Sequence, residues 1–77
     1  MNKTAREMFE ELGYKEREES YKNNEIISIR YANYRDGNWI TIYKNHIECI
    51  RNRANGFLPL NILPAINKQV EELGWNK

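Results

Sequence analysis

The chain has 77 residues, of which 40% are hydrophobic and 30% charged, and its formal net charge is +1. This length accommodates one small domain, residues 1–77, and the composition excludes a highly charged disordered tail. No run approaches the roughly 18 apolar residues of a membrane-spanning helix, and residues 1–4 lack the pattern of a signal peptide. We therefore expect a cytoplasmic protein without membrane attachment.

The first expected element is a helix over residues 5–12. Thr4 and Glu7 have the spacing of a capping box, in which both side chains accept hydrogen bonds from backbone N–H groups. Gly13 supplies the left-handed residue that commonly ends a helix. The apolar residues recur at helical spacing and predict one buried face, formed by Ala5, Met8, Phe9 and Leu12.

The middle of the chain changes to a period of two, which indicates strands. Asp36-Gly37 is a strong signal for a two-residue hairpin turn, and a second turn is expected at Asn45-His46. Residues 15–20 are almost wholly polar and can add an edge strand, with residues 22–24 as its turn. Residues 51–59 read as a connecting loop. The alternation predicts one apolar face with Ile27, Ile29, Tyr31, Ile40 and Ile42, and a second face with Arg30, Tyr34, Trp39, Thr41 and Tyr43.

The expected turns also predict the strand registers. A turn centred on Asp36-Gly37 pairs Tyr34 with Trp39, Ala32 with Thr41, Tyr31 with Ile42, and Arg30 with Tyr43. The second turn places Cys49 beside Ile42 on the apolar face and Ile50 on the other face.

A second helix is expected near the C-terminus. Asn61 is a good N-cap residue, and Pro64 suits the first helical position, although Leu63 is disfavoured in helical angles because a proline follows it. Gly74 ends the helix. Its apolar face is predicted to contain Leu63, Ile66, Val70 and Leu73.

These elements predict an α+β fold. It is a two-layer sandwich in which an antiparallel meander of three or four strands carries both terminal helices on its apolar face. The other face of the sheet is then open to water.

The two helical ends resemble those of a family of small uncharacterised proteins from phages and prophages of Gram-positive bacteria. The resemblance is carried by residues 4–14 (TAREMFEELGY) and 65–75 (AINKQVEELGW). In that family the meander has four strands, which favours a strand over residues 15–20. Pro64 departs from the Glu-rich start of the family's second helix. The family has no assigned activity, so the resemblance implies a fold and a phage or prophage origin, and no catalytic residue.

The sequence predicts no enzymatic activity, no metal site and no cofactor. One cysteine excludes a disulfide framework or a Cys-rich zinc site, and one histidine excludes most multi-histidine metal chemistry. His46 is interpreted as a turn residue in solvent, and Cys49 as a small core residue, because free cysteines are commonly buried.

The open sheet face is the candidate functional surface. Arg30, Tyr34, Trp39 and Tyr43 combine the residue types that dominate protein interfaces. We therefore predict a non-catalytic module that binds a protein partner, such as a phage accessory protein that engages or inhibits a host protein. The same aromatic residues can also stabilise the sheet without binding anything.

Two other functions use the same region. A single-stranded nucleic acid or nucleotide could stack on the aromatic rings, a reading that the small net charge disfavours. An open edge or the open face could also form a homo-oligomer. In the nucleic-acid reading, the phosphates would contact Arg30, Lys44, Arg51 or Arg53.

Overall fold

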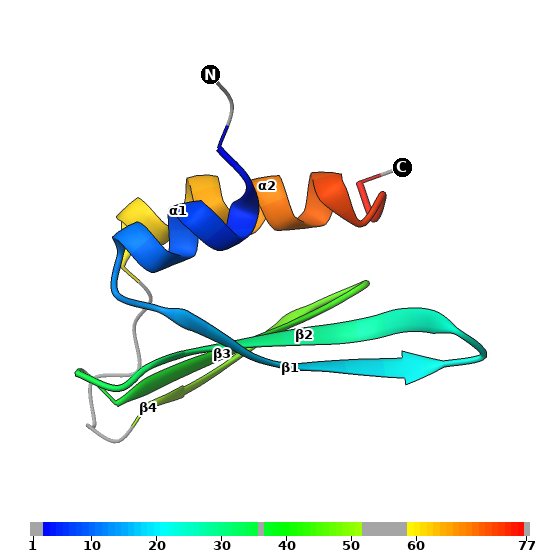
Figure 1. Ribbon diagram of the computed structural model, residues 1–77, viewed down its shortest axis with the longest axis horizontal. Coiled ribbons are helices and arrows are strands. Elements are labelled where there is room, and N and C mark those ends of the chain that lie inside the picture. Colours follow the sequence, from blue (N-terminus) through cyan, green and yellow to red (C-terminus); the bar gives the residue numbers. More distant parts are fainter. Residues whose placement is uncertain (1–2, 36, 52–58, 77) are drawn as a thin grey trace.

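The computed structural model contains a four-stranded antiparallel meander in the order β1-β2-β3-β4, with both helices on one face (Figure 1). The structure describes residues 3–35, 37–51 and 59–76. This arrangement confirms the predicted α+β sandwich. The elements are α1 (Ala5–Glu11), β1 (Lys15–Lys22), β2 (Glu25–Asn33), β3 (Asn38–Tyr43), β4 (Ile47–Arg51), the 3-10 turn η1 (Leu60–Ile62) and α2 (Leu63–Glu72).

Both ends of α1 follow the prediction. The Thr4 side chain accepts a hydrogen bond from the Glu7 N–H at 3.2 Å, and Glu7 accepts one from the Thr4 N–H at 2.9 Å. The bond from the Thr4 N–H, together with one that the Thr4 hydroxyl donates to the Glu7 carboxylate at 3.1 Å, lowers the pKa of Glu7 because both favour its charged form. At the other end, Gly13 has a φ of 91° and the Tyr14 N–H donates to the Phe9 carbonyl at 2.9 Å.

The start of α2 differs from the prediction. Asn61 lies inside η1 and does not cap the helix, which begins directly from this 3-10 turn without a side-chain cap. Leu63 adopts helical angles (φ −56°, ψ −43°) despite the proline that follows it. Pro64 fits the first turn because the N–H groups there have no partner within the helix.

The continuous turn also changes which face of α2 is buried. Leu63 was expected on that face but is 41% exposed. The buried face begins one residue earlier because η1 winds into the helix. Val70 and Leu73 pack against the core as expected. The buried positions are Ile62 in η1 and Ala65, Ile66 and Gln69 in α2.

Residues 15–20 do form a strand, which extends to Lys22. Its turn contains Asn23 and Asn24 with φ values of 54° and 66°, the left-handed pair that a tight hairpin requires. Two register shifts interrupt the pairing of β1 with β2. One leaves Arg17 as an extra residue in β1, and the other leaves Ile27 as an extra residue in β2.

The bulge at Ile27 overturns its predicted place in the apolar face. An extra residue reverses the alternation of side chains along a strand. Ile26 therefore takes the inward position, beside Leu73 and Trp75, whereas Ile27 is 42% exposed.

The predicted register of β2 with β3 is wrong by two residues. Ala32 pairs with Trp39 and Arg30 with Thr41, so the loop between β2 and β3 is longer than a two-residue turn. Asn33 closes this loop, because its carbonyl accepts from the Gly37 N–H at 2.8 Å and its side chain accepts from the Arg35 N–H at 3.0 Å. Tyr31 therefore pairs with Ile40 and not with Ile42, and Asp36 lies outside the described residues.

The register of β3 with β4 is also shifted by two. Cys49 pairs with Ile40, and Ile42 pairs with Ile47. Both shifts are even, so the side chains keep their predicted faces. Cys49 is nevertheless exposed, contrary to the expectation of a core residue. It lies on the outermost strand, and the buried core takes its sheet residues from β2 and β3.

An aromatic stack forms the centre of the core. The Phe9 ring lies parallel to the Tyr31 ring, with centroids 3.8 Å apart, and Tyr14 meets Phe9 edge-on at 5.9 Å. The buried Tyr31 hydroxyl donates to the Gln69 side chain, and burial raises the pKa of Tyr31. α1 and α2 are thus joined to the sheet through one cluster.

A hydrogen bond also joins the two helices where α1 begins and α2 ends. The Ala5 N–H donates to the Glu72 carboxylate at 2.8 Å, so a side chain of α2 satisfies an unpaired donor of α1. No helix in the described part of the chain is both long enough and apolar enough to span a membrane.

Candidate binding surface

The sheet face away from the helices, termed the open face, carries the four residues singled out in the sequence. Arg30, Trp39 and Tyr43 are partly exposed, and Tyr34 is 59% exposed. None of the four is buried, so each can contact another molecule.

Arg30 and Trp39 form the centre of the open face. The Arg30 Nε donates to the Thr41 hydroxyl at 3.0 Å, and its guanidinium carbon lies 5.5 Å from the centroid of the Trp39 ring. The observed register makes both contacts possible, because it places Thr41 directly opposite Arg30. The guanidinium is therefore oriented before any partner binds.

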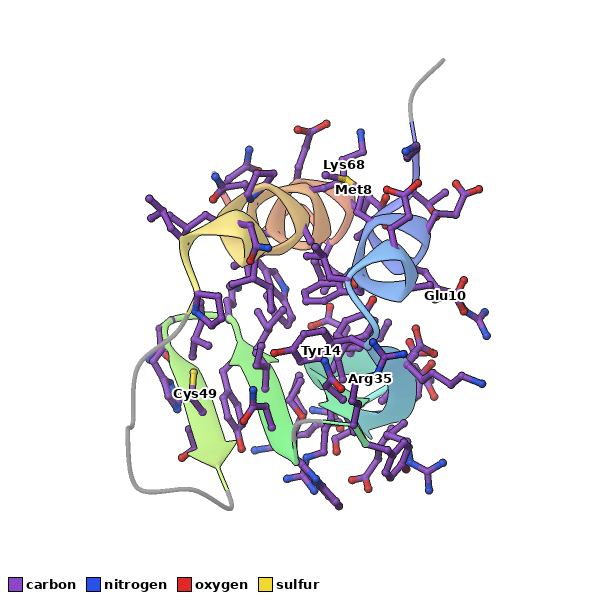
Figure 2. All side chains as sticks on the ribbon, turned by 90° about the vertical axis from the view of Figure 1, so that its left-hand side faces the viewer. Met8, Glu10, Tyr14, Arg35, Cys49 and Lys68 are labelled. Atoms are coloured by element: carbon purple, nitrogen blue, oxygen red, sulfur yellow. The ribbon has the colours of Figure 1, made fainter. Side chains whose placement is uncertain are left out.

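Tyr34 lies apart from this pair, in the loop between β2 and β3. The guanidinium carbon of Arg17, the extra residue of the β1 bulge, lies 5.5 Å from the centroid of the Tyr34 ring. Tyr34 also borders a hollow of ≈ 210 Å³ together with Lys15 and Arg35. In Figure 2, Arg35 lies at the end of the sheet near the turn that follows α1.

The sequence did not predict that basic side chains lie around Tyr34. Lys15 and Arg17 belong to β1, and their approach to Tyr34 depends on the β1–β2 pairing and its bulge. A bulge has no reliable signal in a strand this polar. The structure thus divides the predicted surface into a central pair and a separate loop tyrosine.

Tyr43 lies near the turn between β3 and β4. Its ring stacks on the His46 ring with centroids 4.3 Å apart, and its hydroxyl donates to Glu48 at 3.2 Å. This hydrogen bond to the neutral phenol raises the pKa of Tyr43. Each of the three open-face rings is thus in contact with a basic or imidazole side chain.

The charges of the open face are mixed. The registers place Glu18, Arg30, Thr41 and Glu48 in one row across the four strands. Arg30 has no ion pair within the described residues. The Glu18 carboxylate instead accepts a hydrogen bond from Ser20 at 3.4 Å.

The nucleic-acid reading also includes Lys44, Arg51 and Arg53, and of these side chains the structure describes that of Lys44. Lys44 borders a hollow with Glu25 and Glu72 at the C-terminal end of α2. Arg53 lies outside the described residues.

His46 and Cys49 lie on opposite sides of the sheet. His46 is exposed, and its Nδ1 lies 2.7 Å from the Asn45 side-chain oxygen. Cys49 points to the side of the sheet that carries the helices (Figure 2). Within the described ranges, no group of three or more His, Cys, Asp or Glu residues is arranged to hold a metal ion.

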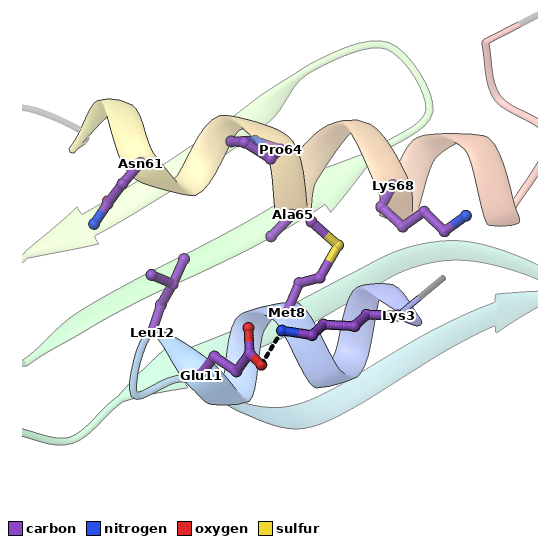
Figure 3. Close-up of a pocket in the computed structure, with 8 residues that line it drawn as sticks. All are labelled: Lys3, Met8, Glu11, Leu12, Asn61, Pro64, Ala65 and Lys68. Atoms are coloured by element: carbon purple, nitrogen blue, oxygen red, sulfur yellow. Dashed lines mark hydrogen bonds and ion pairs between the residues drawn. The ribbon is translucent and has the colours of Figure 1, made fainter. Parts of the chain in front are cut away.

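A groove between the two helices is a further concave feature. It encloses ≈ 440 Å³, and Met8, Leu12 and Ala65 form part of its lining (Figure 3). Lys3 at its border is ion-paired with Glu11. Lys68, which also lines the groove, is ion-paired with Glu71 at 3.4 Å, so each of its lysines has a carboxylate partner within the described residues.

The comparisons with known proteins found no matching family model, no matching curated protein and no matching solved structure. The function is therefore argued from the geometry of the surface.

Proposed function

We propose that this chain is a non-catalytic binding module that contacts a protein partner through Arg30, Tyr34, Trp39 and Tyr43. In keeping with the resemblance of its two helical ends, we place it among the accessory proteins of phages or prophages, where it engages or inhibits a host protein. The partner itself is unspecified.

The observation that carries the proposal is the packing of each open-face ring. Trp39 lies against Arg30, Tyr34 against Arg17, and Tyr43 against His46. Aromatic and arginine side chains contribute most to protein interfaces when they are already ordered, because less side-chain entropy is lost on binding.

The charge distribution favours a protein over a nucleic acid. Glu18 and Glu48 lie in the same cross-strand row as Arg30. Carboxylates at these positions repel a phosphate backbone, whereas a protein partner can pair with both signs of charge. Each ring also has a neighbouring side chain against it, which leaves less ring surface for stacked bases.

The test compares surface variants as bait for a host-cell extract, followed by affinity measurement with the purified partner. Trp39→Ala is expected to weaken binding by at least about 2 kcal/mol, or about 30-fold in Kd. Tyr34→Ala should also weaken it. Tyr21→Ala is the matched control, because Tyr21 has the same exposed fraction as Tyr34, 59%, but lies on the helix-bearing side of β1.

The proposal fails if Tyr21→Ala weakens binding as much as Tyr34→Ala, or if Trp39→Ala has no effect. Salt dependence separates the nucleic-acid alternative. Affinity for single-stranded nucleic acid should fall with a log–log slope of roughly −0.7 per phosphate contacted, and Arg30→Gln should make that slope shallower.

A further inference from the structure

Basic side chains surround the hollow at the end of the sheet where the turn after α1 meets the loop after β2. Lys15, Tyr34 and Arg35 line this hollow, whose volume is ≈ 210 Å³. Arg17 adds a third positive charge, because its guanidinium carbon lies 5.5 Å from the centroid of the Tyr34 ring. Lys15, Arg17 and Arg35 are all exposed and are termed the basic cluster.

The charges of the basic cluster are not compensated by ion pairs within the described residues. The ion pairs recorded there are Lys3–Glu11, Arg6–Glu10 and Lys68–Glu71. The basic cluster therefore presents three positive charges to a ligand at this end of the sheet.

The two glutamates next to Arg17 in the chain take positions away from the hollow. Glu16 lies opposite Tyr31, which is buried in the core, and Glu18 lies opposite Arg30 on the open face. The described residues that line the hollow include neither glutamate. The bulge at Arg17 thus separates a cation from the carboxylates on either side of it in the sequence.

We propose that this hollow binds a phosphate group, either as the free ion or as the terminal group of a phosphate monoester, with the basic cluster as its cationic partner. Guanidinium groups present paired N–H donors that match the oxygen atoms of phosphate, and lysine adds a compact positive charge. Three cations attract a dianion more strongly than a singly charged carboxylate. This site goes beyond the proposed protein contact and does not require it.

Local hydrogen bonds hold the backbone of the site in place. The Arg35 N–H donates to the Asn33 side chain at 3.0 Å, and the same side chain donates to the Leu12 carbonyl at 3.4 Å. Asn33 therefore ties the loop after β2 to the turn after α1. Lys15, the first residue of β1, pairs with Ala32 near the end of β2. Less ordering is then needed when a ligand binds.

The size of the hollow suits one group of a ligand. Pockets that enclose a whole small molecule have volumes of about 300–1,000 Å³. The hollow beside Tyr34 is smaller, at ≈ 210 Å³. It has room for a phosphate group with some of its water, and the rest of the ligand would remain outside.

The neighbouring charges favour a single phosphate over a nucleic-acid strand. Glu18 and Glu48 lie in the cross-strand row of Arg30 on the open face. A strand that continued from the hollow over the open face would bring its next phosphates toward these carboxylates, which repel them. An isolated or terminal phosphate avoids this repulsion.

A titration of the full chain with inorganic phosphate, followed by NMR of the backbone amides, tests the proposal. It is run at about pH 7.5, where phosphate is mainly a dianion, with the ionic strength held constant by sodium chloride. The amide signals of Tyr34 and Arg35 should shift and reach saturation. Lys15→Gln and Arg35→Gln should each weaken binding at least ~5-fold, because each removes a charge-assisted hydrogen bond. Lys22→Gln is the matched control for Lys15→Gln, since Lys22 is exposed at the other end of β1, and it should leave the affinity unchanged.

Further ligands test the charge and the source of the phosphate. Acetate, a monoanion, should bind at least ~5-fold more weakly than phosphate. Phosphoserine and adenosine 5′-monophosphate distinguish a phosphorylated side chain from a nucleotide, because both carry the proposed group and the nucleotide can also stack on Tyr34. Circular dichroism checks that each variant remains folded.

Four results would overturn the proposal. The first is a set of shifts that does not saturate, and the second is an equal loss of affinity in Lys22→Gln and Lys15→Gln. The third is a single-stranded oligonucleotide without a terminal phosphate that binds more tightly than phosphate does. The fourth concerns Asp36, which follows Arg35 in the sequence. Phosphate binding that appears only in Asp36→Asn would mean that the cations are neutralised within the chain.

Discussion

Replacing Phe9 by alanine is expected to destabilise this protein more than any change on the helix surface. The Phe9 side chain is 0% exposed and lies between Tyr31, at a centroid distance of 3.8 Å, and Tyr14, at 5.9 Å. Its removal takes away apolar burial and leaves a cavity that the flanking rings can fill only in part, which costs about 3–5 kcal/mol.

That loss is large for a chain of 77 residues, because domains of this size have an unfolding free energy of about 4–12 kcal/mol. The thermal midpoint should therefore fall by at least about 12 °C, at about 4–8 °C per kcal/mol. Urea unfolding followed by circular dichroism measures the change in free energy, and the slope of the transition shows whether unfolding remains two-state.

Met8→Ala is the control for Phe9→Ala. Met8 lies next to Phe9 on α1 but is only partly buried and borders the groove between the helices. We expect it to cost about 1–2 kcal/mol, because it buries less surface. If both variants lose the same stability, the aromatic stack is not the centre of the core and the packing described above is wrong.

Two predictions concern the carboxylates of Glu72, in α2, and Glu16, in β1. Glu72→Ala should lower the unfolding free energy by about 0.5–2 kcal/mol, since the Ala5 N–H loses its acceptor, whereas Glu71→Ala, an exposed neighbour, should cost less in the same urea titration. Burial and the nearby Glu19 raise the pKa of Glu16, so folding is weakened once this carboxyl is ionised. Glu16→Gln should therefore raise stability at pH 7, and the gain should vanish as the pH falls below the ordinary glutamate pKa of 4.5. A gain at pH 7 that persists unchanged at low pH would contradict this reasoning.

Local sequence signals determined most of the secondary structure. The capping box at Thr4 and Glu7 and the left-handed Gly13 bound α1 because capping depends on residues close in the chain. Except at Ile27, alternation determined which residues of β2 and β3 share a face. That prediction survived two register errors because each error was an even shift, and an even shift leaves every side chain on its own face.

The errors arise from specific contacts that the pattern of one segment does not show. Asn33 lengthens the β2–β3 loop through hydrogen bonds to Arg35 and Gly37, and its side chain also donates to the Leu12 carbonyl at 3.4 Å. The Asp36-Gly37 pattern alone favoured the tighter turn. The bulge at Ile27 arises in the pairing of two strands and not in the sequence of one.

The candidate surface was predictable in composition and not in arrangement. Its side of the sheet followed from the alternation that assigned Arg30 and Trp39 to the face opposite the core. Strand register decides that Arg17 lies against Tyr34 and that Glu18 lies opposite Arg30. The residue pattern within a single strand does not determine that register.

By itself, the sequence determined the order of helices and strands, the two faces of the sheet and the side on which the helices pack. Periodicity and capping act over a few residues, and they can be read without knowing the rest of the chain. Only the tertiary structure decided which residues lie opposite one another and that Cys49 is exposed. The β2–β3 register depends on the hydrogen bonds of Asn33, one of which reaches the Leu12 carbonyl, and the exposure of Cys49 depends on which strands the core covers. Neither can be read from the residues of one strand.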